Sequence, residues 1–500
     1  MDMEGVQGVL IDESLLFKSG KVLHFQPDAH QLLSRLQYSR LCLGLLQRED
    51  DYDVGSNKEF LLRDIGVAES LRYVRLLSNS SPTEALMTAG WAVPFTSSVY
   101  ITGQHPHRVD GDLSSQGWKV IRVAAQPFAG LGNGDTDGSL LTVEQLYEIP
   151  AALAVLNKRA LKDRIVVVGY TMKWSRELEF LKRGALPMLR NSYGLSFVAL
   201  QLNQPLEKQL LAVDVILHKA TDEIVSVNPG HFGTLASIEF SQGIQNLQSY
   251  LQEHAEICVI DPIERILPLL DRVSTQAILK GLKIPAQQII RPPRSVEVTS
   301  FEEPLLSQAL GSQNVVLPTI VKPRIACGAS ESHSMAIVFD LNGFRGLPVP
   351  LPATIQEYVD HGAFQYKMYV VGSKLLYSRR KSTPNASRLA AGNEGSPVIL
   401  FDSLKSLPVE ADMEIPQGQG APEESSELDN EAVQMAASWL SKKLGLTIIG
   451  FDIVVQAGTK DYVIVDVNYF PSFKDVADEE AIPAFWEALV TAFGQWSRSR

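Results

Sequence analysis

The sequence predicts an α/β fold for its first half and an α+β fold for its last part. Short apolar segments alternate with amphipathic ones up to about residue 283, and after Pro285 the strand-like segments follow one another more closely. The chain has 500 residues, 45% hydrophobic and 20% charged, which at roughly 150 residues per domain predicts two to four domains. The expected domains are an N-terminal α/β domain at 1–162, a second α/β lobe at 163–283 and an α+β region at 284–500.

The N-terminal domain is predicted from short strands that alternate with amphipathic segments. Residues 8–11 are short and apolar, residues 31–47 have the spacing of an amphipathic helix, and residues 118–124 again resemble a strand. The glycine-rich run 130–138 fits neither G-x-G-x-x-G nor a P-loop with its Lys-Ser/Thr. We therefore expect a surface loop there.

The second lobe begins with a buried strand at 164–170, which a helix at 175–183 follows. Further apolar strands are expected at 197–202, 214–217 and 257–260, with helices between them. This order is typical of a parallel sheet.

One segment of the C-terminal region differs in composition from the rest. Residues 408–430 combine Pro, Gly, Gln, Ser and several acids with few aromatic or branched apolar side chains. Such a segment buries little apolar surface, so we expect a mobile acidic loop.

The overall composition limits the partners and the compartment. Lys and Arg number 45 against 57 Asp and Glu, a net charge of −12, whereas nucleic-acid binding needs a basic face. No apolar run reaches the ~18 residues of a bilayer-spanning helix, and the N-terminus lacks the features of a signal peptide. The 3 cysteines are widely spaced without a C-x-x-C pair, which indicates reduced thiols. We therefore expect a cytoplasmic or nuclear protein that binds neither nucleic acid nor membrane.

The segments 450–458 and 461–468 predict a β-hairpin. Both are rich in β-branched residues, and we expect a three-residue loop centred on Thr459 between them. In that register Asp452 lies directly opposite Asp466, with the two Cβ atoms about 5 Å apart.

This hairpin face predicts a metal site. Asn468 lies two residues beyond Asp466 and therefore on the same face, whose other residues, Val454 and Ile464, are apolar. Two close carboxylates repel each other in an apolar setting, so one must protonate unless a cation compensates them. Oxygen ligands without His or Cys favour Mg²⁺, which completes its shell with water and substrate phosphates. The alternative is that both acids face solvent at the open end of the hairpin.

Basic side chains gather between 322 and 381 although the chain is acidic. Each small cluster alone is typical of solvated surface charge. Lys322 differs because it ends an apolar strand that begins at Leu317, and such a Lys usually has an anionic partner such as a nucleotide phosphate. The small residues of 328–332 favour a flexible loop whose backbone N–H groups could close over phosphates.

Four segments taken together resemble one kinase family: 317–338, 354–372, 379–387 and 450–474. They resemble the inositol 1,3,4-trisphosphate 5/6-kinases, also called inositol-tetrakisphosphate 1-kinases, and the match covers about Arg164 to the C-terminus. The chain looks most like the long plant type, which has an extra N-terminal domain. The resemblance implies an ATP-grasp fold with a preceding Rossmann-like substrate lobe. It also implies ATP and Mg²⁺ as cofactors and an inositol polyphosphate as substrate.

The resemblance assigns roles to individual residues. The matches to ATP contacts are Lys322, Arg272 and Ser382. The interlobe strand whose backbone meets adenine matches Gln356, Glu357, Tyr358 and Val359. The matches to inositol phosphate contacts are Arg176, Lys219, His333, Lys367, Asn468 and Ser472. The implied Mg²⁺ ligands are Asp452, Asp466 and Asn468, and the implied catalytic residues are Lys322, Asp466 and Asn468.

Four positions depart from the family pattern. Arg176 stands where a substrate-binding Lys is usual, and an Arg forks where a Lys is a point charge. Ala220 replaces the Leu that usually follows the His-Lys pair, and Ser472-Phe473 replaces Gly-Tyr beside the inositol site. These changes leave the preferred inositol phosphate isomer open.

The N-terminal domain carries one motif of its own. Residues 9–14 resemble the first motif of haloacid-dehalogenase-like phosphatases, in which an aspartyl nucleophile is followed two residues later by a second Asp. Asp12 matches the nucleophile, but Ser14 occupies the position of the general acid. Ser78-Asn-Ser80 could mimic the second motif. We expect an α/β core without phosphatase activity, and an unrelated α/β domain is the alternative.

Together these features predict an ATP- and Mg²⁺-dependent, monomeric kinase of soluble inositol tris- or tetrakisphosphates, in inositol phosphate and phytate metabolism. The alternatives are an ATP-grasp ligase, a catalytically inactive inositol-phosphate sensor, and a phosphatase in the N-terminal domain. The metal set and Lys322 favour the kinase over the sensor, and the motifs at His333 and Lys367 favour it over the ligase.

Overall fold

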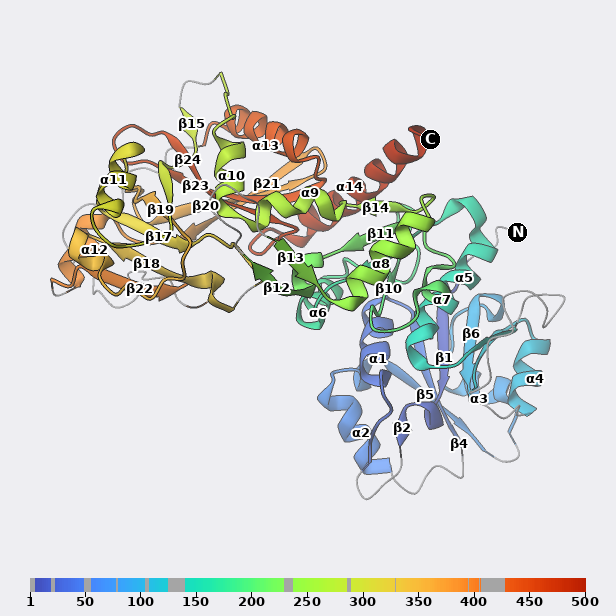
Figure 1. Cartoon of the computed structure of the whole chain (residues 1–500). Coiled ribbons are helices and arrows are strands. Elements are labelled where there is room, and N and C mark those ends of the chain that lie inside the picture. The colour runs from blue at the N-terminus through green and yellow to red at the C-terminus, as the bar shows by residue number, and fades with distance from the viewer. Residues whose placement is uncertain are drawn as a thin grey trace. The chain divides into compact units, whose positions relative to one another are not determined.

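The computed structural model (Figure 1) forms two compact units. The first unit comprises Met1–His218 and Asn246–Val259, and the second comprises Lys219–Gln245 and Ile260–Arg500. The structure describes residues 5–18, 23–48, 55–77, 80–103, 108–124, 140–228, 237–285, 289–328, 330–393, 395–403, 405 and 428–500. The predicted loop at 130–138, the pair 78–79 and the acidic segment 408–427 lie outside these residues. No helix in the described ranges has the length and apolarity needed to cross a bilayer.

The N-terminal part of the first unit is a six-stranded parallel sheet of order β5-β4-β1-β6-β7-β8. Its strands are β1 (Gly8–Asp12), β4 (Cys42–Arg48), β5 (Leu71–Leu76), β6 (Ser98–Thr102), β7 (Lys119–Val123) and β8 (Leu140–Val143). The short strands β2 (Phe17–Lys18) and β3 (His24–Phe25) pair with each other. The helices are α1 (Ala29–Tyr38), α2 (Gly55–Asp64), α3 (Pro82–Thr88), α4 (Arg108–Ser115) and α5 (Ile149–Leu161).

Helices cover both faces of this sheet. Every residue of β1 is buried, as expected for a central parallel strand. Val9 packs with Leu33 of α1 and Leu153 of α5, whereas Leu10, on the opposite face, packs in the cluster that contains Leu86 of α3. The predicted α/β architecture is therefore present.

The predicted helix at 31–47 was wrong in its second half. Helix α1 ends at Tyr38, and Cys42–Arg48 forms β4 beside β1. Arg40, with a φ of 58°, reverses the chain between the two elements. A short apolar run fits a buried strand as well as a helix by its periodicity alone, and here pairing with β1 decides.

The rest of the first unit contains a four-stranded sheet of order β10-β9-β11-β14, close to the predicted strands. Its strands are β9 (Val166–Thr171), β10 (Leu195–Ala199), β11 (Val215–His218) and β14 (Cys258–Ile260). Strands β10 and β11 both pair with β9 in parallel. The helices are α6 (Trp174–Lys182), α7 (Leu206–Leu210) and α8 (Gln242–Glu253), the last of which begins in the second unit.

The second unit contains two five-stranded sheets. The antiparallel sheet β16-β19-β17-β18-β22 consists of β16 (Ser295–Val298), β17 (Thr319–Pro323), β18 (Ser334–Val338), β19 (Ala353–Glu357) and β22 (Val398–Asp402). The sheet β15-β24-β23-β20-β21 consists of β15 (Ile290–Arg291), β20 (Phe364–Val371), β21 (Lys374–Lys381), β23 (Ile448–Val455) and β24 (Tyr462–Tyr469). Strands β12 (Ile224–Asn228) and β13 (Ser237–Phe240) form a separate pair.

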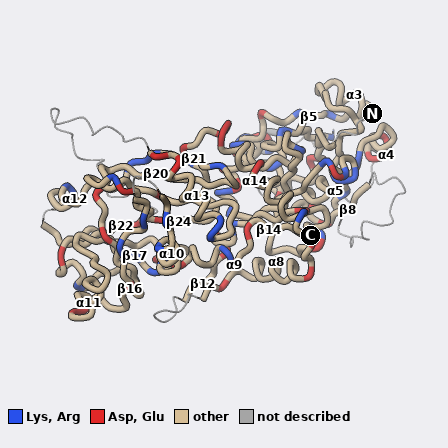
Figure 2. Tube along the Cα trace, turned by 90° about the horizontal axis from the view of Figure 1, so that it is seen from above, with Lys and Arg blue, Asp and Glu red and all other residues tan. Residues whose placement is uncertain are grey.

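The helices of this unit are α9 (Ile263–Ile266), α10 (Arg272–Leu279), α11 (Leu305–Ser312), α12 (Ala386–Gly392), α13 (Asn430–Leu444) and α14 (Asp478–Arg498). Leu306 and Leu310 of α11 pack with Val321 and Ile355 of the first sheet. Figure 2 shows both acidic and basic residues near the labels of β17, β20 and β24.

Asp261 ties the segment before α9 to the hairpin of β23 and β24. Its carboxylate accepts hydrogen bonds from the backbone N–H groups of Thr447, at 2.8 Å, and Ile448, at 3.2 Å, and its own N–H donates to the Tyr469 hydroxyl at 3.1 Å. Burial raises the pKa of Asp261 from 3.8 to about 6, against the opposing effect of these hydrogen bonds. The hydrogen bonds hold the carboxylate in position. Because its pKa is raised, the charged carboxylate lowers the stability of the folded chain.

We expect Asp261→Asn to raise the melting temperature at pH 7.5. The folded chain holds the Asp261 proton more tightly than the unfolded chain, so this group destabilises the fold by about 3 kcal/mol above pH 6 and by nothing well below pH 3.8. The asparagine oxygen can still accept both N–H groups. Thermal unfolding between pH 4 and 8 measures the difference, with Glu264→Gln on α9 as the control for loss of one exposed acid. A gain in melting temperature of Asp261→Asn over wild type that grows as the pH falls would contradict this account.

Candidate active site

Asp452 and Asp466 lie opposite each other on β23 and β24, as predicted. The register shifts just beyond this pair, because Ile453 pairs with Ile464. Val465 is therefore the extra residue of a β-bulge beside Asp466. Bulges redirect side chains and backbone groups locally, and this one lies next to Asp466, one of the three predicted catalytic residues.

The turn of the hairpin is wider than predicted. The ladder ends at Val455 and Tyr462, so residues 456–461 form the loop in place of the three expected. The longer loop and the bulge compensate each other, which leaves the predicted pairing of the two acids correct. Beyond the bulge the prediction was wrong, because Val463 and not Ile464 pairs with Val454.

Lys367 completes a row of charges across the second sheet. It pairs in register with Asp452, and its Nζ lies 3.2 Å from Asp452 Oδ2. The Asp452 side chain is 13% exposed. The pKa of Asp452 is raised to about 6, because burial and repulsion by Asp466 together outweigh the opposing effects of Lys367 and Arg380. A cation beside the two acids would favour their charged forms.

The amide of Asn468 extends the acid pair on the same face of β24. Its Nδ2 donates to Asp466 Oδ2 at 2.9 Å. Two carboxylates and an amide offer only oxygen ligands, a donor set that fits Mg²⁺ held by few protein groups together with phosphates. Within the described ranges, no three His, Cys, Asp or Glu side chains lie close enough to hold a metal. Asp452, Asp466 and Asn468 thus lie together on neighbouring strands, and their role as Mg²⁺ ligands stays a prediction.

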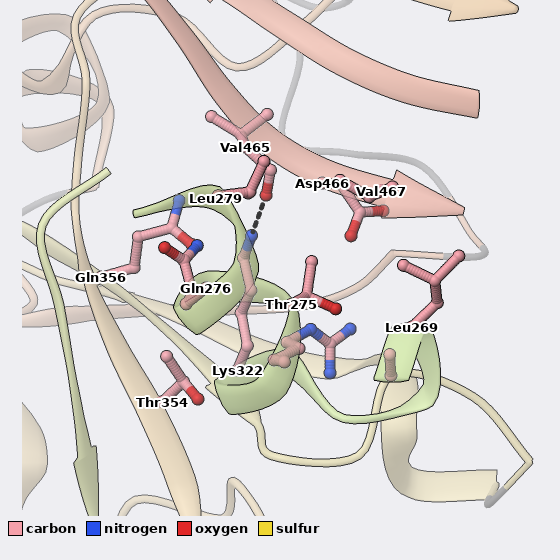
Figure 3. A pocket seen from close by; sticks show the side chains of 12 residues that line it. Leu269, Thr275, Gln276, Leu279, Lys322, Thr354, Gln356, Val465, Asp466 and Val467 are labelled. Carbon is pink, nitrogen blue, oxygen red and sulfur yellow. Dashed lines mark hydrogen bonds between the residues drawn. The ribbon is translucent and has the colours of Figure 1, made fainter. Parts of the chain in front are cut away.

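A pocket lies between the two sheets of the second unit, with α10 as its third wall (Figure 3). Strand β17 contributes Lys322, β19 contributes Thr354 and Gln356, and β24 contributes the run 465–467. Lys322 Nζ donates to the carbonyl oxygen of Val465 at 3.3 Å, drawn as the dashed line in Figure 3. The bulge therefore presents a backbone acceptor to the predicted phosphate-binding lysine.

Lys322 is 8% exposed, which changes its acid–base behaviour. Burial lowers the pKa of Lys322 from 10.5 to about 8; Asp466 and Asp452 oppose this effect, and Arg272 adds to it. An anion bound in the pocket would favour the charged ammonium.

Backbone carbonyls hold Arg272 at the start of α10. Its Nη1 donates to the oxygens of Pro323 and Ile325, both at 2.6 Å, and its Nη2 to the oxygen of Ser332 at 3.4 Å. Arg324, the first residue after β17, binds Asp271 at 2.7 Å, and Asp271 caps α10. Burial lowers the pKa of Arg272, and Asp466 partly restores it. This network fixes two cations of the pocket, Lys322 and Arg272, relative to each other.

Three buried polar atoms of the pocket residues have no hydrogen-bond partner in the described part of the chain: Arg272 Nε, Gln276 Oε1 and Thr354 Oγ1. Buried polar groups without partners are rare, and a polar ligand would satisfy them. Four residues of this pocket were not predicted from the sequence: Thr354, Thr275, Gln276 and Leu279. Residues 275, 276 and 279 follow Arg272 at i+3, i+4 and i+7, so the helical spacing could have found this wall of the pocket.

The predicted adenine-binding segment begins at the edge of the pocket. Gln356 lines it, whereas the carboxylate of Glu357 pairs with Arg291 and accepts the Arg294 N–H at 2.8 Å. The Tyr358 hydroxyl donates to Thr383 or Pro384, each at 2.6 Å. Val359 is buried, in the cluster with Val454 and Val463.

His361 connects this segment to Ser382. Its Nδ1 lies 2.6 Å from the oxygen of Val359, so Nδ1 carries the proton and Nε2 accepts from the Ser382 hydroxyl at 2.9 Å. Burial lowers the pKa of His361, which favours this neutral form. Ser382, a predicted ATP contact, is therefore oriented by His361, which lies within the basic stretch 322–381.

The predicted substrate residues of the second unit are distributed around this site. His333 Nδ1 lies 3.0 Å from Ser403 Oγ, and burial followed by Arg272 lowers the pKa of His333. Lys219 contacts the carbonyl oxygen of Tyr469 and lies 5.2 Å from the centre of the Tyr469 ring. Ser472 follows β24 and is half-buried.

Arg176 lies on α6 of the first unit, where it is half-buried. It directly precedes Glu177, which is buried.

The carboxylate of Asp12 in the N-terminal domain is fully engaged at the end of β1. Oδ1 accepts from the Ser14 N–H at 3.1 Å and hydroxyl at 2.7 Å, and Oδ2 lies 2.5 Å from Arg48 and 3.1 Å from the Tyr100 hydroxyl. A nucleophilic carboxylate needs an oxygen that can reach substrate. The arrangement supports a structural role for Asp12, and absence of phosphatase activity stays a prediction.

Comparison with known families gives three matches along the chain. Residues 285–488 match the inositol 1,3,4-trisphosphate 5/6-kinase ATP-grasp domain, and residues 167–266 match the pre-ATP-grasp domain of the same family. Residues 3–159 match a family described as "ITPK4, N-terminal HAD-like domain".

Similar proteins carry related names. Inositol-tetrakisphosphate 1-kinase 6 of Oryza sativa subsp. japonica is 37% identical over 481 residues, which cover 94% of this chain and 85% of that protein. Inositol-tetrakisphosphate 1-kinase of Danio rerio is 28% identical over 326 residues, 65% of this chain and 77% of that protein. With its ATP-grasp region and its HAD-like N-terminal domain, the chain belongs to the inositol-tetrakisphosphate 1-kinase family.

Proposed function

We propose that this protein transfers the γ-phosphate of ATP to a hydroxyl of a soluble inositol tris- or tetrakisphosphate, with Mg²⁺ as the second cofactor. The observation that carries the proposal is the opposed pair Asp452 and Asp466 beside the pocket that holds Lys322 and Arg272. Family membership supports an inositol phosphate kinase, and the oxygen-only donor set supports the metal.

Phosphoryl transfer requires mainly positioning and neutralisation of charge on a loose transition state. Bound Mg²⁺ would screen the charges of the β- and γ-phosphates. The chain's own residues would do the rest: Lys322 and Arg272 bind the nucleotide phosphates, and His361 orients the hydroxyl of Ser382. The proposed inositol phosphate ligands are Arg176, Lys219, His333, Lys367, Asn468 and Ser472.

An ATP-grasp ligase and an inactive inositol-phosphate sensor are the two competing functions. A ligase would form an amide from an acyl phosphate, and a sensor would bind ligand without producing ADP. We further propose a monomer that acts in the cytoplasm or nucleus without nucleic acid or membrane partners.

The decisive experiment is an incubation of the full chain with ATP, Mg²⁺ and a panel of inositol tris-, tetrakis- and pentakisphosphates. Anion-exchange chromatography then resolves the products beside those of Asp466→Asn. A more highly phosphorylated product that only the wild type makes would support the kinase and name its substrate. Ligand binding without any product would point to the sensor instead.

Lys367→Ala is expected to raise KM for the inositol phosphate about tenfold, with a smaller change in KM for ATP. Loss of one charge-assisted hydrogen bond to a phosphate accounts for this magnitude. Initial rates with each substrate varied in turn measure the two constants. Lys374→Ala on the neighbouring strand is the control, because Lys374 pairs with the exposed Glu487. Unchanged KM and kcat in Lys367→Ala would remove Lys367 from the substrate site.

A further inference from the structure

A buried ion pair joins the N-terminal domain to helix α6 within the first unit. Arg35 of α1 donates through Nε to Glu177 Oε1 at 2.7 Å and through Nη2 to Oε2 at 3.1 Å. Both side chains are 6% exposed. Two parallel N–H···O bonds fix the orientation of the pair as well as its distance.

Glu177 has a second partner on β9, the strand that directly precedes α6 in the sequence. The Tyr170 hydroxyl at the end of β9 donates to Glu177 Oε1 at 2.8 Å. Burial alone would lower the pKa of Arg35, but Glu177 raises it above its usual value. Glu177 therefore connects α1 to β9 through one buried carboxylate, which would be costly to leave unpaired.

Further contacts of the N-terminal domain reach the start of α6 and the segment after it. Arg35 lies 5.8 Å from the ring centre of Trp174, the first residue of α6, and His30 meets the same ring edge-on at 5.8 Å. The Met188 N–H donates to the Ser39 hydroxyl at 3.1 Å, and the Met188 side chain belongs to the core cluster of the N-terminal domain. Figure 1 shows α1 in blue and α6 in teal. The N-terminal domain thus holds α6 at its first turn, at its middle and just beyond its end.

We propose that the N-terminal domain positions α6, and with it Arg176, for binding the inositol phosphate, with Arg35 as the positioning residue. The inference rests on the proposed function, because only the substrate role of Arg176 connects α6 to the reaction. Arg176 directly precedes Glu177, so the buried pair fixes the backbone from which Arg176 extends. The N-terminal domain, which we predict to lack phosphatase activity, thereby contributes to substrate affinity.

Arg35→Met in the full chain tests this proposal. We expect KM for the inositol phosphate to rise about tenfold, the effect of losing one well-placed phosphate contact, with KM for ATP changed less than twofold. Arg35→Lys keeps the charge but not the fork, and should fall between wild type and Arg35→Met. The matched control is Arg63→Met, because Arg63 forms an exposed i,i+4 pair with Glu59 on α2 of the same domain. All rates are measured below the melting temperature of each variant.

Hydrogen exchange provides a readout that does not depend on activity. Arg35→Met should accelerate exchange of the α6 amides relative to wild type, and Arg63→Met should not. A lower melting temperature with unchanged KM for both substrates would show that Arg35 is merely structural, and would overturn the proposal. Unchanged α6 exchange would overturn it too. If the wild type phosphorylates no inositol phosphate, the proposed function fails, whatever the exchange of α6 shows.

Discussion

Asp466→Asn is expected to lower kcat by about 10² to 10³-fold, the range for removal of one preorganised electrostatic group. Asp466 faces Asp452 in register, accepts the amide of Asn468 and lines the pocket with Lys322. The substitution removes one carboxylate from the proposed metal ligands and one countercharge from the pocket. Substrate positioning by other residues is left in place, so the loss should fall mainly on turnover.

The fold of Asp466→Asn should persist. Asp466 raises the pKa of Asp452 by electrostatic repulsion. Replacing Asp466 with the neutral Asn removes this repulsion. Rates at saturating ATP and at several Mg²⁺ concentrations, together with circular dichroism, measure both effects. The matched control is Asp461→Asn in the turn of the same hairpin, for which we expect near-normal rates. Turnover close to wild type in Asp466→Asn would remove the metal assignment.

Local patterns predicted most of the fold because burial and pairing agreed with them. The strands at 8–11 and 164–170 are continuous apolar runs, and both became central strands of parallel sheets. The prediction of a helix over 31–47 was wrong in its second half, because a short apolar segment does not by its own pattern distinguish a helix from a buried strand. Pairing with β1 makes the second half a strand, and this pairing is a contact in space that the segment itself does not encode.

The acids of the site were predictable, and their surroundings were not. A period of two places Asp452 and Asp466 on one face once the hairpin is recognised, although the loop length and the bulge were both missed. The bulge matters because it turns the Val465 carbonyl to Lys322. The carbonyls that hold Arg272 and the hydroxyl that pairs with His361 come from distant segments, and no local periodicity encodes such contacts.

Lys322→Met is expected to lower kcat/KM for ATP about 10²-fold or more, because it removes the buried ammonium that we propose binds the ATP phosphates. The same substitution is expected to raise the melting temperature. The folded chain holds Lys322 at a pKa of about 8 against an ordinary 10.5, so the unfolded chain binds this proton more tightly. Below pH 8 the buried ammonium therefore costs about 3 kcal/mol of stability, and this cost fades as the pH rises towards 10.5. Methionine fills a similar volume without the charge.

Thermal unfolding and nucleotide binding of the same variant separate the two effects. We expect the gain in melting temperature to be full at pH 7 and smaller at pH 9.5, and ATP to stabilise the wild type more than Lys322→Met at equal concentration. Lys374→Met is the control, because Lys374 is half exposed and pairs with Glu487 at the surface. If Lys322→Met is less stable than wild type and binds ATP with wild-type affinity, both halves of the prediction are contradicted. Lys322 would then be a structural partner of the Val465 carbonyl, and another residue of the pocket would have to bind phosphate.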